Sequence, residues 1–185
     1  KYRSTLIIKT KRDMANITFK KLVEQEYAKF RADVKEIFSI AVIETFGNPD
    51  HQEEIIPDND IDLSLYNPQY EALAVYAEGE KVGGVVIKID SQTGINWLDL
   101  FYVYPDKHGQ GLGLQIWKGL EKRYPNTKAW RLITPYFEKR NIHFYVNKCG
   151  FKIVEFFNKA HRDPSRPSGR SDFHDEYFIF EKVMD

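Results

Sequence analysis

The sequence predicts a single α/β (α+β) domain in which helices flank a mixed β-sheet. Three strand-like segments follow one another between residues 72 and 104, and only short turns separate them, which is typical of an antiparallel meander. Farther along the chain, helix-like and strand-like segments alternate, which favours a sheet with helices packed on it. The length of 185 residues suits one domain with a core of its own.

The N-terminal part of the chain predicts a strand and a long helix. We expect residues 1–16 to be an extension ahead of the domain and Ile17 to Leu22 to form the first strand. From Gln25 to Phe46, apolar residues recur at helical spacing, and Gly47 follows in the position of a C-cap. Residues 48–67 are acidic and interrupted by prolines, so we expect a loop with one helical turn.

The rest of the chain alternates between strand-like runs and amphipathic segments. A helix is predicted from Leu114 to Tyr124, because apolar residues recur there every four positions. A shorter helix is predicted from Arg140 to Lys148, where Gly150 ends it. The predicted strands are residues 72–77, 82–89, 95–104, 129–134, 151–157 and 177–183, with a polar loop at 158–174.

Composition and charge exclude several classes of function. The chain carries 27 basic and 27 acidic side chains, so it lacks the basic excess that is typical of nucleic-acid binders. Cys149 is the single cysteine, which leaves no internal disulfide and no cysteine-based zinc site. No apolar run approaches the roughly 18 residues of a membrane span. We therefore expect a cytoplasmic domain, monomeric or homodimeric, that binds no nucleic acid, membrane or metal.

The segment from Tyr104 to Gly113, which reads YPDKHGQGLG, lies between a predicted strand and a predicted helix. A glycine-rich turn at such a junction leaves backbone N–H groups unpaired at the start of the helix, where the helix dipole adds positive potential. Gly109, Gly111 and Gly113 allow a tight turn and a close approach of a ligand to the backbone. The segment therefore predicts a site for a phosphate or pyrophosphate.

Two nucleotide-binding motifs do not fit this turn. A P-loop requires Gly, four residues and then Gly-Lys followed by Ser or Thr, and the chain contains no such string. A dinucleotide fingerprint, G-x-G-x-x-G, would require glycine in place of Leu114 or Ile116. The turn also follows an antiparallel meander, whereas the fingerprint opens a parallel β-α-β unit. Both nucleotide interpretations fail.

The same residues resemble the acyl-CoA loop of the GCN5-related N-acetyltransferase (GNAT) family. The family signature at this junction is Arg/Gln-x-x-Gly-x-Gly/Ala, and the chain reads HGQGLG from His108 to Gly113, after a V-x-P element at Val103 and Pro105. His108 departs from the usual Arg or Gln, but the glycines are kept. Binding of phosphate through the backbone therefore remains available.

A second resemblance to the family lies downstream. The family motif is similar to N-x-x-A/S/N-x-x-F/L-Y-x-x-x-G-F, and the chain reads EKRNIHFYVNKCGF from Glu138 to Phe151. Asn141 falls at the small or polar position and Tyr145 at the tyrosine, whereas Glu138 replaces the leading Asn. The resemblance is strongest over residues 72–183. It implies the GNAT fold, with a mixed, mostly antiparallel central sheet flanked by helices.

The resemblance implies acetyl-CoA as the acyl donor. The pantetheine arm would lie along a strand edge, and the pyrophosphate would rest on the N–H groups of the glycine turn. The expected contacts are Phe101, Tyr102, Val103, His108, Gly109, Gln110, Gly111, Leu112, Gly113, Leu114, Asn141 and Tyr145. Because a thioester is already activated and backbone donors can stabilise the oxyanion, no metal is expected.

Two side chains are candidates for proton transfer. A free alkyl amine has a pKa of about 10.4, so a group must remove a proton before the amine attacks. Asp99 is a candidate general base, and strand alternation would place it on the same face as Phe101 and Val103. The alternative for Asp99 is an ordinary polar residue on the sheet. Tyr145 matches the family's general acid for the departing thiolate, and the alternative is an aromatic packing residue.

These observations together predict an acyl-CoA-dependent N-acyltransferase, and among these an acetyltransferase, that works by direct transfer in a ternary complex. We favour a small-molecule primary amine over a protein as the acceptor. The alternative function is a non-catalytic CoA-binding or sensor module with the same fold, to which the departures at His108 and Glu138 point. Tyr145 and Asp99 favour the enzyme.

Overall fold

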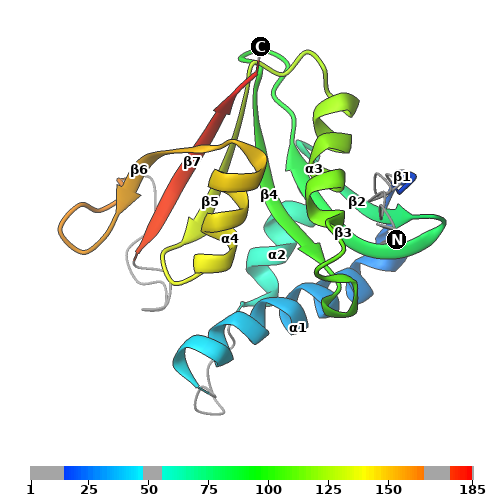
Figure 1. Cartoon of the computed structure of the whole chain (residues 1–185), viewed down its shortest axis with the longest axis horizontal. Helices are drawn as coiled ribbons and strands as arrows, with labels where there is room; N and C mark the ends of the chain where they lie inside the picture. Colours follow the sequence, from blue (N-terminus) through cyan, green and yellow to red (C-terminus); the bar gives the residue numbers. More distant parts are fainter. Residues whose placement is uncertain (1–14, 48–55, 165–175, 185) are drawn as a thin grey trace, which may run out of the picture.

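The computed structural model of the chain describes residues 15–47, 56–164 and 176–184. A seven-stranded sheet in the order β1-β2-β3-β4-β5-β7-β6 runs through these residues (Figure 1). Neighbouring strands are antiparallel except β4 and β5, which are parallel. The strands are β1 (Ile17–Lys21), β2 (Tyr70–Ala77), β3 (Glu80–Lys88), β4 (Ile95–Val103), β5 (Ala129–Pro135), β6 (Lys152–Phe157) and β7 (Tyr177–Val183).

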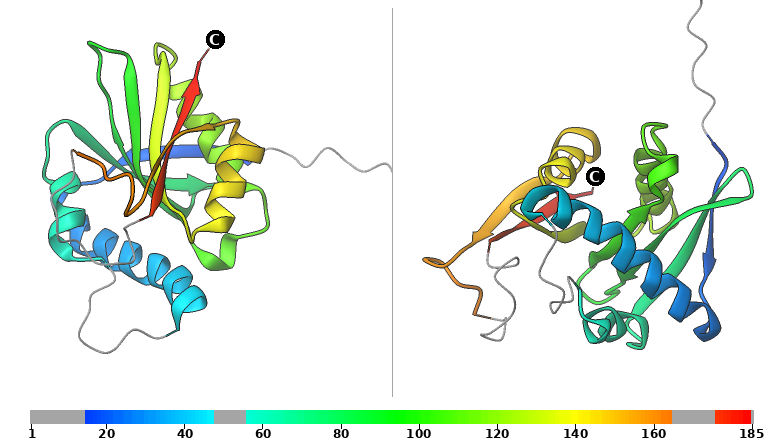
Figure 2. Two further views of the ribbon diagram at one scale, coloured as in Figure 1. Left: turned by 90° about the vertical axis from the view of Figure 1, so that its left-hand side faces the viewer. Right: turned by 90° about the horizontal axis from the view of Figure 1, so that it is seen from below.

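Helices cover both faces of the sheet (Figure 2). α1 and α2 pack on one face, whereas α3 and α4 lie on the other, and α4 continues directly as a π-helix. The helices are α1 (Tyr27–Phe46), α2 (Asp58–Leu65), α3 (Leu112–Arg123), α4 (Lys139–His143) and the π-helix (Phe144–Cys149), with short 3-10 turns at Glu24–Glu26 and Pro105–Lys107. The predicted mixed, mostly antiparallel sheet with flanking helices is confirmed.

Alternation along the strands divides the apolar side chains between two cores. On β2, Leu73 and Val75 belong to the core beneath α3, whereas Ala74 belongs to the core beneath α1 and α2. Trp117 of α3 and Phe30 of α1 are fully buried, one in each core. Because both faces are covered, the central strands are fixed by packing on either side.

The region before β2 contains more helix than the sequence predicts. Instead of one turn within residues 48–67, α2 spans eight residues. Acidic residues in its first turn complement the helix dipole, and Ile61 and Leu65, one turn apart, are buried against the sheet. Tertiary packing therefore stabilises α2, although its polar sequence does not predict a helix of this length. Residues 48–55 lie outside the described part of the chain.

Other predicted boundaries are close to the observed ones. The helix predicted from Arg140 to Lys148 corresponds to α4 and the π-helix together. The predicted loop at 158–174 is described only as far as Pro164, and the predicted extension only from Ala15. Among the described helices, none is both long and apolar enough to cross a membrane.

β4 and β5 pair with each other only over their first halves. Residues 95–98 of β4 lie beside residues 129–132 of β5. Beyond this point, β4 continues against β3 as far as Val103, and β5 continues against β7 as far as Pro135 (Figure 1). The two strands therefore present facing edges that do not pair with each other.

β4 carries a bulge where it separates from β5. Its pairing with β3 changes register from Leu100↔Val86 to Leu98↔Ile87, which leaves Asp99 as an extra residue on β4. Leu98 belongs to the core beneath α3, whereas Leu100 packs against the core beneath α1. Two residues that alternation would place on one face thus lie on opposite faces.

Candidate active site

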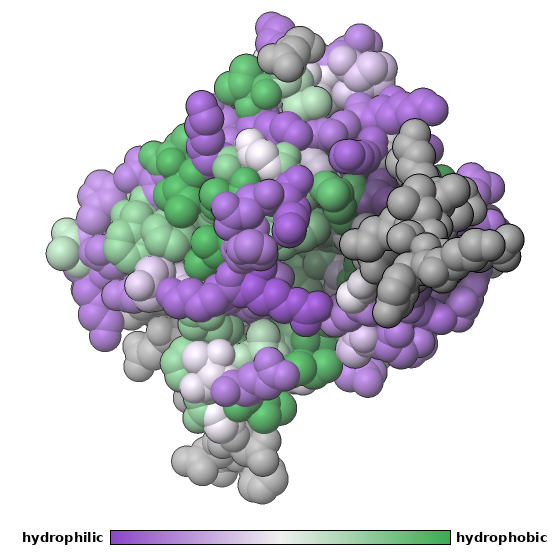
Figure 3. Space-filling model, viewed as in Figure 1, coloured by the Kyte–Doolittle hydropathy of each residue, from purple (hydrophilic) through white to green (hydrophobic). Residues whose placement is uncertain are grey.

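A pocket lies where β4 and β5 separate, with walls from α1, β4, β5 and the start of α4. Figure 3 shows apolar side chains around a hollow at the centre of the face that carries α3 and α4. The lining residues are Phe38, Val42, Ile56, Leu98, Asp99, Phe101, Leu132, Ile133, Thr134, Pro135, Phe137, Glu138, Asn141 and Tyr145. Two carboxyls and a phenol therefore lie within a largely apolar enclosure.

The glycine turn leaves a row of backbone donors at the start of α3. Gly109 and Gly111 have φ angles of 77° and 76°, in the left-handed region that favours glycine, and Gly111 is the N-cap of the helix. Within residues 15–47, 56–164 and 176–184, no group accepts a hydrogen bond from the N–H groups of Gly109 to Leu114. With the positive end of the α3 dipole, these donors form a site for an anionic group.

His108 points away from this row of donors. Its ring Nε2–H donates to the carbonyl oxygen of Val103 at 2.7 Å, and its backbone N–H donates to the carbonyl oxygen of Pro105 at 3.1 Å. The free donors therefore begin at Gly109, and the expected contact from the N–H of His108 is not available in this conformation. The imidazole ties the glycine turn to the end of β4.

The open edge of β4 offers two of the three main chains that the sequence predicts as contacts. A Cβ atom placed on Gly83 of β3 would lie 2.1 Å from the carbonyl oxygen of Tyr102, so the main chain of Tyr102 faces β3. Because successive residues of a strand direct their backbone groups to opposite sides, those of Phe101 and Val103 face the unpaired edge. The predicted set of main-chain contacts narrows to Phe101 and Val103.

A buried carboxylate on α1 holds the end of β4 in place. Asp33 is 2% exposed and accepts hydrogen bonds from the hydroxyls of Tyr104 at 2.7 Å and Tyr102 at 3.3 Å. Lys29 and Lys81 lie 2.7 and 3.8 Å from its oxygens. Burial by itself raises the pKa of Asp33, but the bonds from Lys29 and Tyr104 and the charge of Lys81 hold it below its usual value. Asp33 therefore remains ionised at neutral pH.

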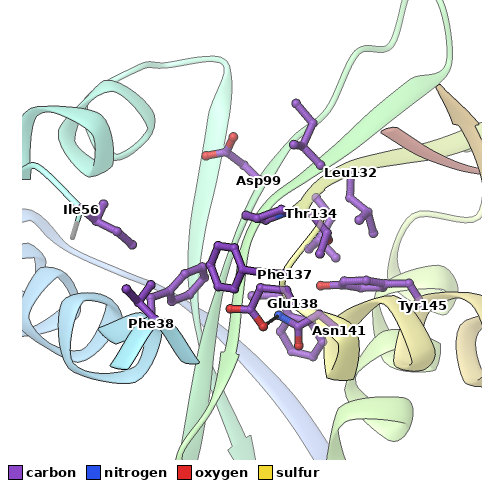
Figure 4. A pocket seen from close by; sticks show the side chains of 14 residues that line it. Phe38, Ile56, Asp99, Leu132, Thr134, Phe137, Glu138, Asn141 and Tyr145 are labelled. Atoms are coloured by element: carbon purple, nitrogen blue, oxygen red, sulfur yellow. Dashed lines mark hydrogen bonds between the residues drawn. The ribbon is translucent and has the colours of Figure 1, made fainter. Parts of the chain in front are cut away.

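Tyr145 lies on the π-helix with its hydroxyl directed into the pocket (Figure 4). The residue is 8% exposed, and its hydroxyl forms no hydrogen bond with another described residue. The rings of Phe144, Phe151 and Phe180 surround it at centroid distances of 5.2, 5.7 and 6.0 Å. Burial raises the pKa of Tyr145, so the hydroxyl is protonated at neutral pH and able to donate.

Asp99 faces α2 rather than the side of the pocket that carries Tyr145 (Figure 4). The hydroxyl of Ser64 on α2 donates to its Oδ2 atom. Desolvation by the surrounding protein raises the pKa of Asp99, and the bond from Ser64 opposes this effect. The prediction that Asp99 shares a face with Phe101 and Val103 is wrong, because the bulge shifts the alternation immediately after Asp99.

Glu138 lines the pocket beside Asn141 and Tyr145, although the sequence marks it only as a departure from the family motif. The amide of Asn141 donates to Glu138 Oε2 at 3.0 Å. Burial raises the pKa of Glu138, an effect that the charge of Arg140 opposes and that of Glu44 reinforces. The replacement of Asn by Glu at this position is the sequence signal for a second carboxyl in the pocket.

Cys149 is 3% exposed and is therefore a small buried residue. Burial raises the pKa of its thiol to about 12, so the reactive thiolate is scarce at neutral pH. In the described part of the chain, no three His, Cys, Asp or Glu side chains form a group that could hold a metal ion. The ionisable side chains that line the pocket are Asp99, Glu138 and Tyr145.

Comparison with known sequences shows a clear match. Residues 28–151 match the profile of a family described as "Acetyltransferase (GNAT) family". The chain is also 48% identical over 168 residues to the uncharacterized protein YrkN of Bacillus subtilis (strain 168), an alignment that covers 87% of this chain and 90% of that protein. The matched family segment runs from the start of α1 to the residue after the π-helix and its glycine.

Solved structures share the fold. The ribosomal-protein-S18-alanine N-acetyltransferase of Escherichia coli has a TM-score of 0.60 at 14% identity, covering 91% of this chain and 94% of that one. A GNAT family acetyltransferase of Elizabethkingia anophelis with acetyl-CoA bound has a TM-score of 0.58 at 15% identity, covering 91% and 99%. The PaiA N-acetyltransferase of Thermoplasma acidophilum in complex with coenzyme A has a TM-score of 0.56 at 18% identity, covering 91% and 99%. These likenesses confirm the predicted fold.

Proposed function

Because this chain belongs to the acetyltransferase (GNAT) family, we propose that it transfers the acetyl group of acetyl-CoA to a primary amine by direct attack in a ternary complex. The main support for the proposal is the relative position of the backbone donors and Tyr145. The free backbone donors of residues 109–114 follow directly on the open edge of β4, and the unpartnered hydroxyl of Tyr145 lies in the pocket at that edge. Donor binding and proton transfer would thus share one opening in the sheet.

The donor half of the site fits acetyl-CoA. The N–H groups from Gly109 to Leu114 would hold the pyrophosphate. The open backbone groups of Phe101 and the N–H of Val103 would pair with the amides of the pantetheine arm as an added strand does, since the Val103 carbonyl oxygen already accepts from His108. Bound acetyl-CoA supplies a thioester carbonyl that is already activated for attack. Two structural relatives whose descriptions name coenzyme A or acetyl-CoA support this choice of donor.

Tyr145 is the proposed general acid. Its protonated hydroxyl is directed into the pocket and has no competing partner among the described residues, so it is free to donate to the sulfur of the leaving thiolate. The three phenylalanine rings around it restrict its rotation. A fixed donor of this kind needs little reorganisation when charge develops on the sulfur.

The acceptor half of the pocket favours a small-molecule amine. Phe38 and Val42 of α1, together with Ile56, close the pocket on the side opposite the donor loop with apolar walls. An ammonium group that enters must lose a proton before it attacks, and the pocket offers two carboxyls for this purpose, Asp99 and Glu138.

An amine panel tests the proposal. Purified protein is incubated with acetyl-CoA and individual primary amines, and release of the free thiol is followed, with Tyr145→Phe as the matched variant. We expect turnover with at least one amine and a large loss of turnover in the variant.

Binding is tested separately by thermal shift, where a ligand at a hundredfold excess over its Kd stabilises the protein by about 2.7 kcal/mol. Stabilisation by NAD or ATP and none by CoA would contradict the proposal, and CoA binding without turnover would identify a sensor module.

A further inference from the structure

We infer that Glu138 is the catalytic base of the pocket and that its carboxylate takes the proton from a primary alkylammonium acceptor. This inference rests on the proposed function and deepens it. It differs from the assignment drawn from the sequence, which places Asp99 in that role. The two carboxyls are distinguished by their positions, their hydrogen bonds and the groups around them.

Position favours Glu138. Glu138 begins α4 and Tyr145 lies on the π-helix that continues it, so both side chains reach the pocket from the same side (Figure 4). The negative charge of Glu138 contributes to the raised pKa of Tyr145, which reflects their proximity. Asp99 is turned toward α2 instead. An acceptor that attacks a thioester beside Tyr145 therefore arrives next to Glu138.

The hydroxyl of Tyr145 is placed to contact a ligand that enters the pocket beside Glu138. The residue is 8% exposed, its hydroxyl is directed into the pocket, and it has no hydrogen-bond partner among the described residues. The hydroxyl is not among the described buried polar atoms that lack a partner, so it is accessible from the pocket and available to a bound ligand. The reacting groups would complete the hydrogen bonding of Tyr145 next to Glu138.

The hydrogen bonds of the two carboxylates also differ. In Glu138, Oε2 accepts from the amide of Asn141, whereas Oε1 accepts no bond from any described residue. No basic side chain in the described ranges forms an ion pair with Glu138. Asp99 accepts a hydrogen bond from the hydroxyl of Ser64. Glu138 therefore keeps an oxygen free for an N–H of the acceptor and, within the described ranges, a carboxylate with no ion-pair partner.

The charges around Glu138 suit a base. Burial raises its pKa, the positive charge of Arg140 on α4 lowers it, and the negative charge of Glu44 on α1 raises it again. Tyr145, the remaining titratable neighbour, stays neutral. A carboxylate whose pKa is raised accepts a proton more readily than an ordinary carboxylate, which is the property of an effective general base.

Each proton that moves in the reaction has a defined donor and a defined acceptor. The acceptor R–NH₃⁺ gives one proton to the Glu138 carboxylate, and the neutral nitrogen forms a bond to the thioester carbonyl carbon. The C–S bond breaks with its electron pair on sulfur, which takes the proton of Tyr145, and the phenolate recovers a proton from the new amide nitrogen. The products are the N-acetylated amine, the free thiol and one proton, which Glu138 returns to solvent.

The walls of the pocket define the body of the acceptor. Phe38, Val42 and Phe137 present hydrocarbon surface around the two carboxyls. Burial of apolar ligand surface against them is favourable, at roughly 25 cal/mol per Å², whereas ligand hydroxyls would be left without partners. The few polar groups of the pocket are engaged by the reacting amine and thioester, so we expect alkylamines and arylalkylamines as acceptors, in preference to amino sugars with their several hydroxyls.

The test compares Glu138→Gln and Asp99→Asn across pH with one alkylamine. The Gln variant keeps the oxygen that Asn141 contacts, and its Tm and circular dichroism report its folding. We expect its kcat to fall about 100-fold or more near neutral pH, with the deficit shrinking as rising pH deprotonates the amine in solution. Asp99→Asn is expected to change the KM of the amine more than kcat. A Glu138→Gln profile within about twofold of the wild type at every pH would overturn the inference.

An acceptor of low basicity sharpens the test. 2,2,2-Trifluoroethylamine is largely neutral at pH 7, so Glu138→Gln should lose far less activity with it than with an alkylamine. Equal losses with both amines would refute the role as base. Glu44→Gln is the control, because it removes a nearby charge that does not line the pocket, and it should shift the acidic limb of the wild-type profile to lower pH without changing maximal kcat.

A measurement on the free protein separates the two proposals. Because the folded-state pKa of Glu138 is raised, its ionisation destabilises the fold as pH rises, and Glu138→Gln should gain Tm over the wild type more at pH 8 than at pH 4. No gain at pH 8 would contradict the inference even where the enzyme is active. If the wild type acetylates no amine, thiol release is zero in every variant and both proposals fail together.

Discussion

The donor side and the acceptor side of the pocket are made of different parts of the protein. The donor side consists of main-chain groups from one continuous stretch, residues 101–114. The acceptor side consists of side chains that α1, β4, β5 and α4 bring together from distant parts of the sequence. A backbone site needs only glycine at the right spacing, whereas a side-chain site exists only once the whole sheet has formed.

This difference has a practical consequence for substitutions. Changes on the donor side should alter the affinity for acetyl-CoA whatever the amine, because the backbone donors contact a constant ligand. Changes on the acceptor side should alter the use of the amine and leave CoA binding intact. Each side can therefore be perturbed while the other serves as its control.

Tyr145 stands between the two sides and should give the largest effect. Tyr145→Phe removes the proton donor and keeps the ring packing, so we expect kcat to fall about 100- to 1,000-fold, as thiol release would measure. The Kd for CoA, measured by calorimetry, should change by less than about twofold. A loss of CoA affinity as large as the loss of kcat would show that the hydroxyl serves donor binding instead.

Asp33 should affect both sides at once. Asp33→Ala leaves the hydroxyls of Tyr102 and Tyr104 without their acceptor, which should cost about 2–3 kcal/mol of unfolding free energy. For a chain of this size, the corresponding fall in Tm is about 5–10 °C. Lys20→Ala, at an exposed position on the edge strand β1, is the control and should change Tm little.

The pH dependence of stability tests the same carboxylate. The pKa of Asp33 is lower in the folded than in the unfolded protein, so its contribution is complete above the unfolded pKa of about 3.9 and is lost as pH falls through the folded value. The Tm difference between wild type and Asp33→Ala should therefore be constant near neutral pH and shrink below about pH 4. A difference that grows in acid would mean that Asp33 is not ionised in the fold.

Gly111→Ala should weaken the donor side selectively. Its φ of 76° costs a residue with a Cβ about 1–2 kcal/mol, and any relaxation displaces the backbone donors at the start of α3. We expect the KM for acetyl-CoA to rise about 5- to 10-fold while the KM for the amine is unchanged. Gly47→Ala is the matched control, since Gly47 has a φ of 81° at the distant end of α1. If both variants change KM equally, the loss reflects general destabilisation.

Ser64→Ala should give the smallest effect, confined to the acceptor side. The variant removes the hydrogen bond to Asp99, a change worth about 0.5–1.5 kcal/mol, so the KM for the amine should change by a few-fold. Because this bond opposes the raised pKa of Asp99, its loss should raise that pKa further. A change in the KM for acetyl-CoA of similar size would break the distinction between the two sides.

The features that the sequence predicted correctly are determined by residues close together in the chain. The glycine turn follows from the spacing of Gly109, Gly111 and Gly113, and the strands follow from runs of β-forming residues with clear turns between them. The short helix that ends before Gly150 follows from the position of that glycine. In each case, the segment itself contains the information.

The positions that the sequence predicted wrongly or missed are determined by contacts between distant segments. The direction of Asp99 follows from a bulge against β3, which no periodicity in β4 reveals. The helix α2 is stabilised by the burial of Ile61 and Leu65 against strands that come later in the chain. Glu138 enters the pocket only because β4 and β5 separate in front of it.

The two halves of α1 have consequences for how new specificities can arise. Asp33 near its start is bonded to the end of β4, whereas Phe38 and Val42, farther along, line the pocket. Random mutagenesis restricted to positions 38 and 42 should therefore yield variants that accept amines of other shapes while expression and acetyl-CoA use are maintained. In evolutionary terms, the helix combines a fixed anchor with an adaptable surface, which would allow closely related chains to diverge in substrate with few substitutions.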